Sequence, residues 1–160
     1  MRISEQIWPR VVALVCSVDK NGKPNVMTAS FLMPVSFNPK YIAVSIAPER
    51  HTFENLKEVK EMTVNICDAS MREIAEFCGS CSGRNVDKFE EANLSKEVSE
   101  AVSPPCVKQA PVSFECKVEG MHRYGDHFIV VGRVVKEHVR RKEFKPLLHR
   151  SGSQYCAVEE

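Results

Sequence analysis

Residues 10–33 read RVVALVCSVDKNGKPNVMTASFLM, and this stretch predicts the class of fold. β-branched and apolar residues fill positions 10–18, as is typical of a strand. Asn21-Gly22 follows, the pair of residues that most strongly indicates a tight hairpin turn. The chain is then expected to return as a second strand over residues 24–33. The protein is therefore predicted to begin with an antiparallel hairpin.

The remainder of the chain continues this pattern of short strands. Further strands are expected at residues 41–47, 62–67, 112–121 and 128–135. Thr52 is the predicted N-cap of a short helix, and a capping box at residues 70–73 opens a second one. Residues 78–89 are expected to be loop at first and then helical, and residues 92–110 to form a long surface connection. About six or seven strands in antiparallel hairpins predict a mainly β barrel closed on itself, because closure removes unpaired edges.

Two of these strands differ in their pattern of side chains. Residues 112–121 alternate between apolar and polar side chains, which predicts one buried face and one face in solvent. The expected solvent face carries Ser113, Glu115, Lys117 and Glu119. Residues 128–135 are instead apolar on both faces. One face is expected to cover the barrel core, and a partner subunit is a candidate to cover the other.

The composition is that of an ordinary globular protein, and residues 1–160 are expected to form one domain. The net charge is +1, so nucleic acid is not an expected partner. No stretch approaches the ~18 apolar residues of a membrane helix, and the N-terminus lacks the apolar core of a signal peptide. A cytoplasmic location without membrane contact is therefore expected. In that reducing compartment, the seven cysteines are expected to be free thiols.

Two segments with cationic side chains are candidate anion sites. Arg50-His51-Thr52 places a guanidinium, an imidazole and a hydroxyl at a helix start, where free N–H groups favour a phosphate. An ordinary capped helix with a surface arginine is the alternative. The segment at residues 79–84, GSCSGR, lets the backbone approach a ligand closely, and Lys88 adds a positive charge. It matches neither a Walker loop nor a dinucleotide fingerprint, and by itself it also fits an ordinary loop.

Two further segments are candidates for binding a flat ring and for holding a proton. The small residues Thr28-Ala29-Ser30 leave a shelf on which a ring can lie, although small residues also occur at tight barrel bends. His127 follows the turn Gly125-Asp126 and can deliver or hold a proton beside a redox centre. A half-exposed histidine without a chemical role is the alternative.

Taken in order, these segments resemble the flavin reductase-like, FMN-binding split-barrel family. The resemblance extends over residues 8–156 and rests on an ordered series of segments, not on one motif. The matching segments are residues 9–15, 22–25, 28–31, 33–39, 43–46, 50–52, 64–65, 78–84, 87–89, 125–127, 131–132 and 146–148. The resemblance implies a mainly β, antiparallel split barrel of Greek-key type with a few short flanking helices.

The resemblance also implies a cofactor and the residues that hold it. In this family FMN is bound without a covalent bond at the interface of a homodimer. The implied residues are Arg50 and Thr52 at the phosphate with help from Lys88 and Ser30, Thr28 and Ala29 beside the isoalloxazine ring, Ser45 and Ile46 on its other approach, and Ser80, Ser82 and Gly83 closing the pocket. His127 is implied to lie near the reactive edge of the ring, as the one candidate catalytic residue with a modulating role.

The implied reaction is the transfer of a hydride from NADH or NADPH to the flavin, followed by electron transfer to free flavin, a ferric chelate or a protein acceptor. No protein nucleophile is required for this chemistry. A non-enzymatic FMN-binding electron carrier, similar to flavoredoxin, is the alternative, because nothing in the sequence identifies a nicotinamide site. An interaction module that has lost its flavin is disfavoured by the presence of Arg50, Thr52 and Lys88.

Cys78 and Cys81 depart from the family pattern, because relatives often lack the second cysteine. A Cys-x-x-Cys pair beside a flavin can be a redox relay or half of a metal site. A zinc site needs two more ligands, and the sequence has no second pair at ligand spacing. No metal site is therefore expected, and two unrelated thiols on a loop are the favoured interpretation.

Overall fold

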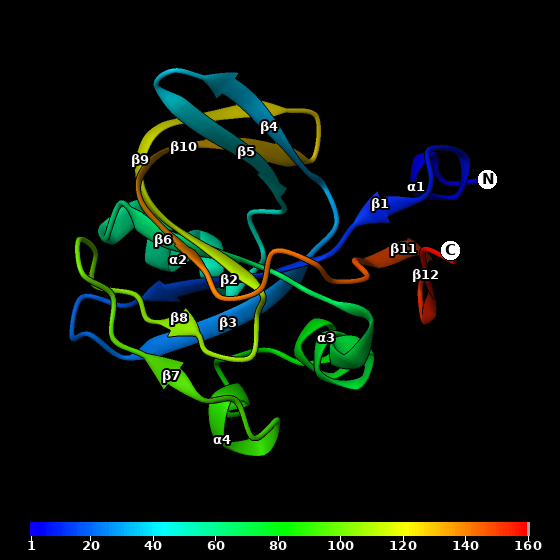
Figure 1. The fold of residues 1–160 in the computed structure, drawn as a ribbon. Helices are drawn as coiled ribbons and strands as arrows, with labels where there is room; N and C mark the ends of the chain where they lie inside the picture. Colours follow the sequence, from blue (N-terminus) through cyan, green and yellow to red (C-terminus); the bar gives the residue numbers. More distant parts are fainter. Residues whose placement is uncertain (160) are drawn as a thin grey trace.

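The computed structural model describes residues 1–159, and strands dominate its architecture. About 47% of the residues lie in strands and 18% in helices. The main sheet has seven antiparallel strands in the order β3-β2-β6-β9-β10-β5-β4 and curls into a barrel (Figure 1). These strands are β2 Ala13–Val18, β3 Pro24–Ala29, β4 Leu32–Phe37, β5 Lys40–Ile46, β6 Glu61–Ile66, β9 Val112–Tyr124 and β10 His127–Val139. The predicted mainly β, antiparallel split-barrel class is confirmed.

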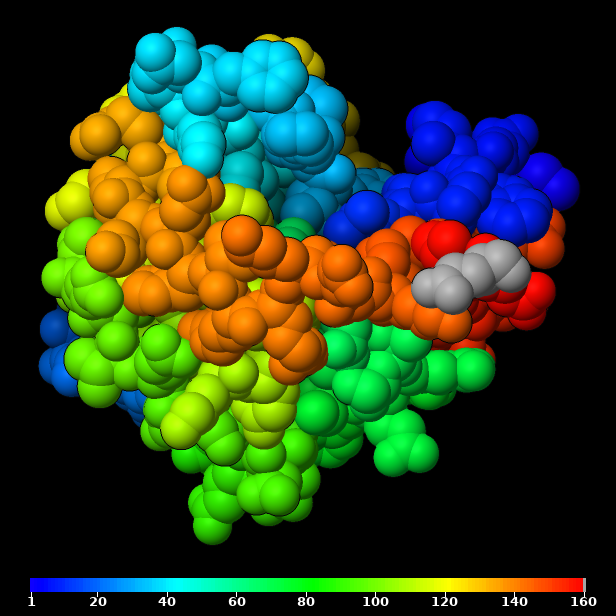
Figure 2. Space-filling view, viewed as in Figure 1, coloured from blue at the N-terminus to red at the C-terminus, as the bar shows by residue number. Residues whose placement is uncertain are grey.

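Short helices and small sheets surround the barrel. The helices are α1 Ile3–Gln6, α2 His51–Glu58, α3 Arg72–Ser80 and α4 Lys88–Glu91, with a 3₁₀ turn at Ala69–Met71. β7 Lys96–Glu97 pairs with β8 Cys106–Val107, and β1 Arg10–Val11, β11 Leu147–Ser151 and β12 Gln154–Ala157 form a third sheet. That sheet joins the two chain ends in a lobe that projects from the barrel (Figures 1 and 2). No helix within residues 1–159 is long and apolar enough to cross a membrane.

The opening hairpin forms as predicted, but its second strand ends early. β2 and β3 pair with Val15 opposite Met27, and Gly22 has a φ of +82°, a conformation that favours glycine. β3 stops at Ala29, where the predicted strand continued to residue 33. The chain turns away because the Phe31 carbonyl accepts a hydrogen bond of 2.8 Å from the Ser45 amide of β5. β3 and β4 thus become the two edges of the sheet. The barrel is split, as the family resemblance implied, although the strand pattern alone had favoured closure.

Two clusters of buried apolar side chains lie on opposite faces of the sheet. Alternate residues of β2 belong to the two clusters, Ala13 and Val15 to one, and Leu14 and Cys16 to the other. The first cluster fills the barrel. The second lies between the sheet and the elements that follow β6, and includes Ala75, Cys78, Phe89, Val107 and Ala110. Because both of its faces are covered, β2 is buried throughout.

The helix starts differ from the sequence prediction. Arg50, not Thr52, is the N-cap of α2, and the buried Thr52 hydroxyl instead contacts Asn25. Asp68, not Ser70, caps the turn before α3, with its carboxylate accepting the Ser70 amide at 3.0 Å. α3 also continues to Ser80, so the first part of the predicted loop at residues 78–89 is helical. The helix extends this far because burial of Cys78 in the second cluster holds its last turn against the sheet.

The predicted solvent face of β9 is wrong for two of its residues. Ser113 and Glu115 are fully buried. The Ser113 hydroxyl donates to Asn65 Oδ1 at 2.7 Å, and the Glu115 carboxylate accepts the Ala101 amide at 2.6 Å. The segment at residues 92–110, predicted to be a surface connection, supplies the amides that contact Glu115 and makes this face a second interior.

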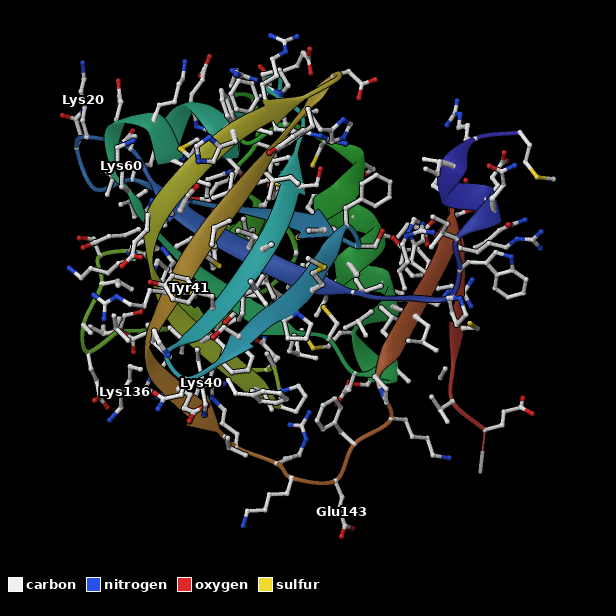
Figure 3. The ribbon with its side chains drawn as sticks, turned by 90° about the horizontal axis from the view of Figure 1, so that it is seen from above. Lys20, Lys40, Tyr41, Lys60, Lys136 and Glu143 are labelled. Carbon is white, nitrogen blue, oxygen red and sulfur yellow. The ribbon has the colours of Figure 1, made fainter. Side chains whose placement is uncertain are left out.

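The strand β10 retains a partly uncovered apolar face. Val130 is buried, whereas Ile129 and Val131 on the other side remain partly exposed in the single chain. Near the far end of β10, the Lys40 ammonium donates to the Glu137 carboxylate at 2.6 Å and ties β5 to this strand (Figure 3). The cover that the sequence predicted for the outer face is therefore not supplied by residues 1–159.

Candidate functional site

A cleft with two adjoining lobes lies where β3, the end of β5, the start of α2 and the end of α3 meet. The lobes have volumes of about 580 and 470 Å³. Both are lined by Met27, Ala47, Arg50, Gly79 and Ser80, so they form one continuous site. Such a volume is within the range of clefts that hold small ligands and cofactors.

The smaller lobe, termed the cationic lobe, is lined by Asn25, Arg50, His51, Thr52, Ser82, Gly83, Arg84 and Lys88 together with the shared residues. Lys88 is only 5% exposed, and its ammonium donates to the Cys78 carbonyl at 2.7 Å. An ammonium group has three donors, so two are left for a ligand. Burial lowers the pKa of Lys88, and the charge of Arg50 acts in the same direction. A buried cation beside a second cation favours an anionic ligand.

Two buried residues that line the cationic lobe are joined by a hydrogen bond. Asn25 Nδ2 donates to Thr52 Oγ1 at 3.0 Å. A Cβ atom at Gly83 would lie 1.8 Å from Asn25 Oδ1, so a residue with a side chain cannot take this position without moving the loop. Because the Thr52 hydroxyl accepts from Asn25, its own proton is left to donate to a ligand.

The larger lobe, termed the wide lobe, is lined by the predicted ring-binding residues Thr28, Ala29, Ser45 and Ile46, together with Ser30 and His127. The Thr28 hydroxyl donates to the Ala75 carbonyl of α3 at 2.5 Å, which fixes this side chain. His127 Nδ1 donates to the Asp126 carboxylate at 2.7 Å, which leaves Nε2 as the second functional atom of the ring. The side of the wide lobe formed by β3, β5 and the start of β10 thus combines small side chains with the imidazole of His127.

Every residue that the sequence predicted to bind the cofactor lines this cleft. One of them lies in the other lobe from the one that its predicted role requires. Ser30, predicted to help at the phosphate, lies in the wide lobe, where its hydroxyl is 2.9 Å from His149 Nδ1. β3 runs from Asn25 in one lobe to Ala29 in the other, and Ser30 follows it directly. Five residues of extended chain span roughly 17 Å. The structure therefore separates Ser30 from Thr52 and Lys88.

Comparison with known proteins assigns the chain to a family. The model of the flavin reductase like domain matches residues 6–159. The chain belongs to this family. The resemblance that the order of sequence segments indicated is confirmed.

Relatives in the flavin reductase-like family match nearly the whole chain. An uncharacterized protein of Archaeoglobus fulgidus is 32% identical over 82% of this chain and 73% of its own length. The structure of nitrilotriacetate monooxygenase component B from Bacillus cereus is 30% identical, covers 99% of this chain and 88% of its own, and has a TM-score of 0.88. Flavoredoxin of Desulfovibrio vulgaris (Miyazaki F) is 25% identical, covers 96% of this chain and 89% of its own, and has a TM-score of 0.87.

One wall of the cleft in this flavin reductase-like protein was not predicted from the sequence. It is the β11–β12 hairpin, which brings His149, Gly152, Ser153 and Tyr155 to the wide lobe. His149 Nε2 donates to the Gly152 carbonyl at 2.9 Å, so Nδ1 accepts the proton of the Ser30 hydroxyl. The His149 and Tyr155 rings lie 4.7 Å apart between centroids. The only sequence signal for this hairpin was Gly152, which lies between two short runs of polar and aromatic residues. This pattern indicates a turn, but it does not show where the hairpin packs in the fold.

Cys78 and Cys81 lie at the end of α3 beside the cationic lobe. Cys78 is buried, and burial raises its pKa to about 11. The Cys81 thiol donates to the Phe77 carbonyl at 3.5 Å. All seven cysteines are free thiols, as the sequence predicted. Because the thiolate is the reactive form, the raised pKa of Cys78 favours two unrelated thiols over a redox relay.

Proposed function

We propose that this protein binds FMN in the two-lobed cleft and acts as an NAD(P)H-dependent flavin reductase. The observation that carries the proposal is the buried Lys88 ammonium, with two donors left for a ligand, at one end of a cleft whose other end is wide and lined by small side chains. FMN has the matching shape and charge, with a phosphate dianion at one end and a flat ring at the other. Membership of the flavin reductase-like family supports the same cofactor.

The residues of the cationic lobe are suited to hold the phosphate. Lys88 and Arg50 supply charge, and the Thr52 hydroxyl supplies a neutral donor. The first amides of a helix generally lack partners inside it, although the Phe53 amide of α2 donates to the Arg50 carbonyl at 3.0 Å. The helix dipole also favours an anion at this end. Gly83 lets the loop close over the site because it has no side chain to meet Asn25. These groups together make a site for a dianion.

The residues of the wide lobe are suited to hold and orient the ring. Bound FMN would supply the redox chemistry, taking electrons from NADH or NADPH and passing them to free flavin, a ferric chelate or a protein acceptor. Ala29 and Ile46 offer small or apolar surface to the ring. His127, held by Asp126 through Nδ1, has Nε2 free to hold a proton, whereas Nε2 of His149 already donates to the Gly152 carbonyl. We assign it the modulating role that the sequence suggested.

An FMN-binding electron carrier is the second candidate, and the structural likeness to flavoredoxin favours it. The two functions share the cleft and differ only in the electron donor. Titration with FMN under fluorescence detection tests the cofactor, and a protein that leaves FMN fluorescence unchanged contradicts both candidates. Anaerobic mixing of the FMN complex with NADH or NADPH then separates them, because bleaching of the flavin absorbance identifies the reductase and persistent colour identifies the carrier.

The pH dependence of FMN binding is predicted from Lys88. In the free protein burial lowers the pKa of this lysine below its usual 10.5, so its charge is lost at a lower pH than that of an exposed lysine. Since only the charged form attracts the phosphate, the ratio of FMN affinity to riboflavin affinity should fall as pH rises from 7 through the lowered pKa. FMN and riboflavin carry the same isoalloxazine ring, so any effect of its ionisation on affinity cancels in this ratio. Lys88→Met should lower the ratio at pH 7 and flatten its pH profile, and a wild-type ratio that is constant with pH would contradict the prediction.

A homodimer is also part of the proposal, and the exposed strand β4 supports it. Met33 is 57% exposed and Phe37 is 99% exposed on this edge of the sheet. An apolar edge strand is a common site for association with another chain. Phe31, just before β4, lines the wide lobe, so a partner over β4 would reach the rim of the cleft. This surface adds to the half-exposed face of β10 that the sequence indicated.

Met33→Glu is expected to convert the dimer to a monomer, because burying an unpaired carboxylate in an interface is strongly unfavourable. The matched control is Val98→Glu, since Val98 is 89% exposed and lies away from β4. Sedimentation equilibrium of both variants and the wild type measures the effect. A Met33→Glu protein that remains dimeric, or a wild-type protein that is a monomer, would contradict the proposed interface.

A further inference from the structure

A cluster of three different metal-binding side chains lies outside the flavin cleft. Cys106 comes from β8, Glu115 from β9 and His138 from β10. One ligand atom from each lies within 4.8 Å of the other two. None of these residues lines either lobe of the cleft. The cluster therefore has no part in the function proposed above.

The cluster is buried beneath the segment that follows β7. Cys106 and Glu115 are fully buried, and the His138 side chain is 14% exposed. The Glu115 carboxylate accepts amides of the covering segment, from Ala101 at 2.6 Å and from Glu100 at 3.1 Å. Its remaining partner is His138 Nε2 at 2.5 Å. Because the His138 side chain is partly exposed, solvent can reach the cluster beside its imidazole ring.

The charge of Glu115 lacks a permanent cation. Within residues 1–159 no lysine or arginine forms an ion pair with it, since Lys136 pairs with Glu100 at 2.9 Å and Arg140 pairs with Glu97 at 2.7 Å. A buried carboxylate needs a compensating charge as well as hydrogen bonds. His138 supplies that charge only while its imidazole is protonated, whereas a divalent ion supplies it permanently.

We propose that Cys106, Glu115 and His138 bind one zinc ion. Thiolate, imidazole and carboxylate together are ligands of zinc, whereas calcium and magnesium take oxygen ligands. On binding, a Zn–S bond replaces the S–H bond of Cys106 and the proton leaves to solvent. His138 binds through Nε2 and carries its proton on Nδ1. The thiolate and the carboxylate then balance the two positive charges of the ion, and water takes the fourth position.

The required rearrangement is small. A tetrahedral zinc ion with bonds of about 2.0–2.3 Å holds its ligand atoms roughly 3.3–3.8 Å apart. The ligand atoms already lie within 4.8 Å of one another. To admit the ion, the hydrogen bond between His138 and Glu115 has to open, and Cys106 Sγ has to give up its contact with Ser99 Oγ at 3.6 Å. The partly exposed His138 side chain can move to allow this. The ion would then fasten the covering segment to β9 and β10, and zinc should raise the melting temperature.

Zinc uptake by the full-length, untagged protein tests the site. After removal of metal with a chelator and dialysis against zinc, mass spectrometry of the metal content should give one zinc per chain. Cys106→Ser and His138→Gln should each lose this zinc and the zinc-induced rise in melting temperature. Cys156→Ser and His122→Gln are matched controls, because both residues are exposed and outside the cluster, and they should keep both properties. His138→Gln retains a donor for Glu115, so far-UV circular dichroism should show a folded protein.

A wild-type protein that takes up no stoichiometric zinc overturns the proposal, and the cluster is then an ion pair with a neighbouring thiol. Zinc retained by folded His138→Gln and Cys106→Ser also overturns it, as does zinc lost from either control. Loss from the two cluster variants alone supports it. None of these outcomes depends on flavin binding, so failure here and failure of the proposed function are distinguishable.

Discussion

Arg50→Ala is expected to weaken FMN binding by about 1.5–3 kcal/mol, the size of a charge-assisted hydrogen bond, and to leave riboflavin binding almost unchanged. The Arg50 guanidinium lines both lobes of the cleft at the N-cap of α2. No ion pair engages it within residues 1–159, so its charge is available to a phosphate. Riboflavin lacks the phosphate and therefore reports any damage to the ring site. Fluorescence titration with both flavins measures the two affinities.

Arg84 provides the matched control, because it lines the same lobe but is already engaged. Its guanidinium pairs with Glu54 at 3.0 Å and donates to the Glu49 carbonyl at 3.1 Å. Arg84→Ala should therefore cost less FMN affinity than Arg50→Ala. If Arg50→Ala lost equal affinity for FMN and for riboflavin, Arg50 would act by maintaining the shape of the cleft and not by binding the phosphate. Unchanged affinity for FMN would show that the phosphate lies elsewhere.

Asn65→Ala is expected to lower the free energy of unfolding by about 3–4 kcal/mol, because it leaves several buried groups without partners. Asn65 is fully buried in β6, where Nδ2 donates to the Leu14 carbonyl at 2.9 Å and to Thr63 Oγ1 at 3.1 Å. Its Oδ1 accepts the Val107 amide at 2.9 Å and the Ser113 hydroxyl at 2.7 Å. One side chain thus joins β2, β6, β8 and β9.

Urea unfolding of the flavin-free protein measures this effect, since a bound ligand would add its own contribution to stability. Asn85→Ala is the control, because Asn85 is exposed on the loop after α3 and should change stability by less than about 0.5 kcal/mol. A loss below about 1 kcal/mol in Asn65→Ala would mean that water replaces the lost hydrogen bonds. The network would then contribute little to stability.

Much of the fold could be predicted from the sequence, because strand pairing here is mostly between neighbours in the chain. The hairpins β2–β3 and β9–β10 each join consecutive strands, and local turn residues mark them. β4 was not predicted as a strand of its own. The end of β3 was misplaced because the bend at Ser30-Phe31 depends on a hydrogen bond to Ser45 in another strand. No local residue preference signals such a contact.

The polar face of β9 is a second feature for which local sequence patterns do not reveal a tertiary contact. Alternation of apolar and polar residues predicts two different faces, but it does not report what covers each one. Glu115 is buried only because the segment around Ala101 folds over it and donates to its carboxylate. A glutamate in an alternating strand otherwise belongs to a solvent face. The cluster with Cys106 and His138 was for this reason invisible in the sequence.

The sequence by itself determined the antiparallel class of this protein and the residues of the cationic lobe, since strand patterns, turn residues and a helix start are local features. Arg50, Thr52 and Lys88 were recognisable because each has a charge or a donor at a position where an anion can be held. Only the tertiary structure decided which strands form the edges of the split barrel and that His149 stands against Ser30, 119 positions earlier in the chain. Contacts of that range depend on how whole elements pack, and no short window of residues contains them.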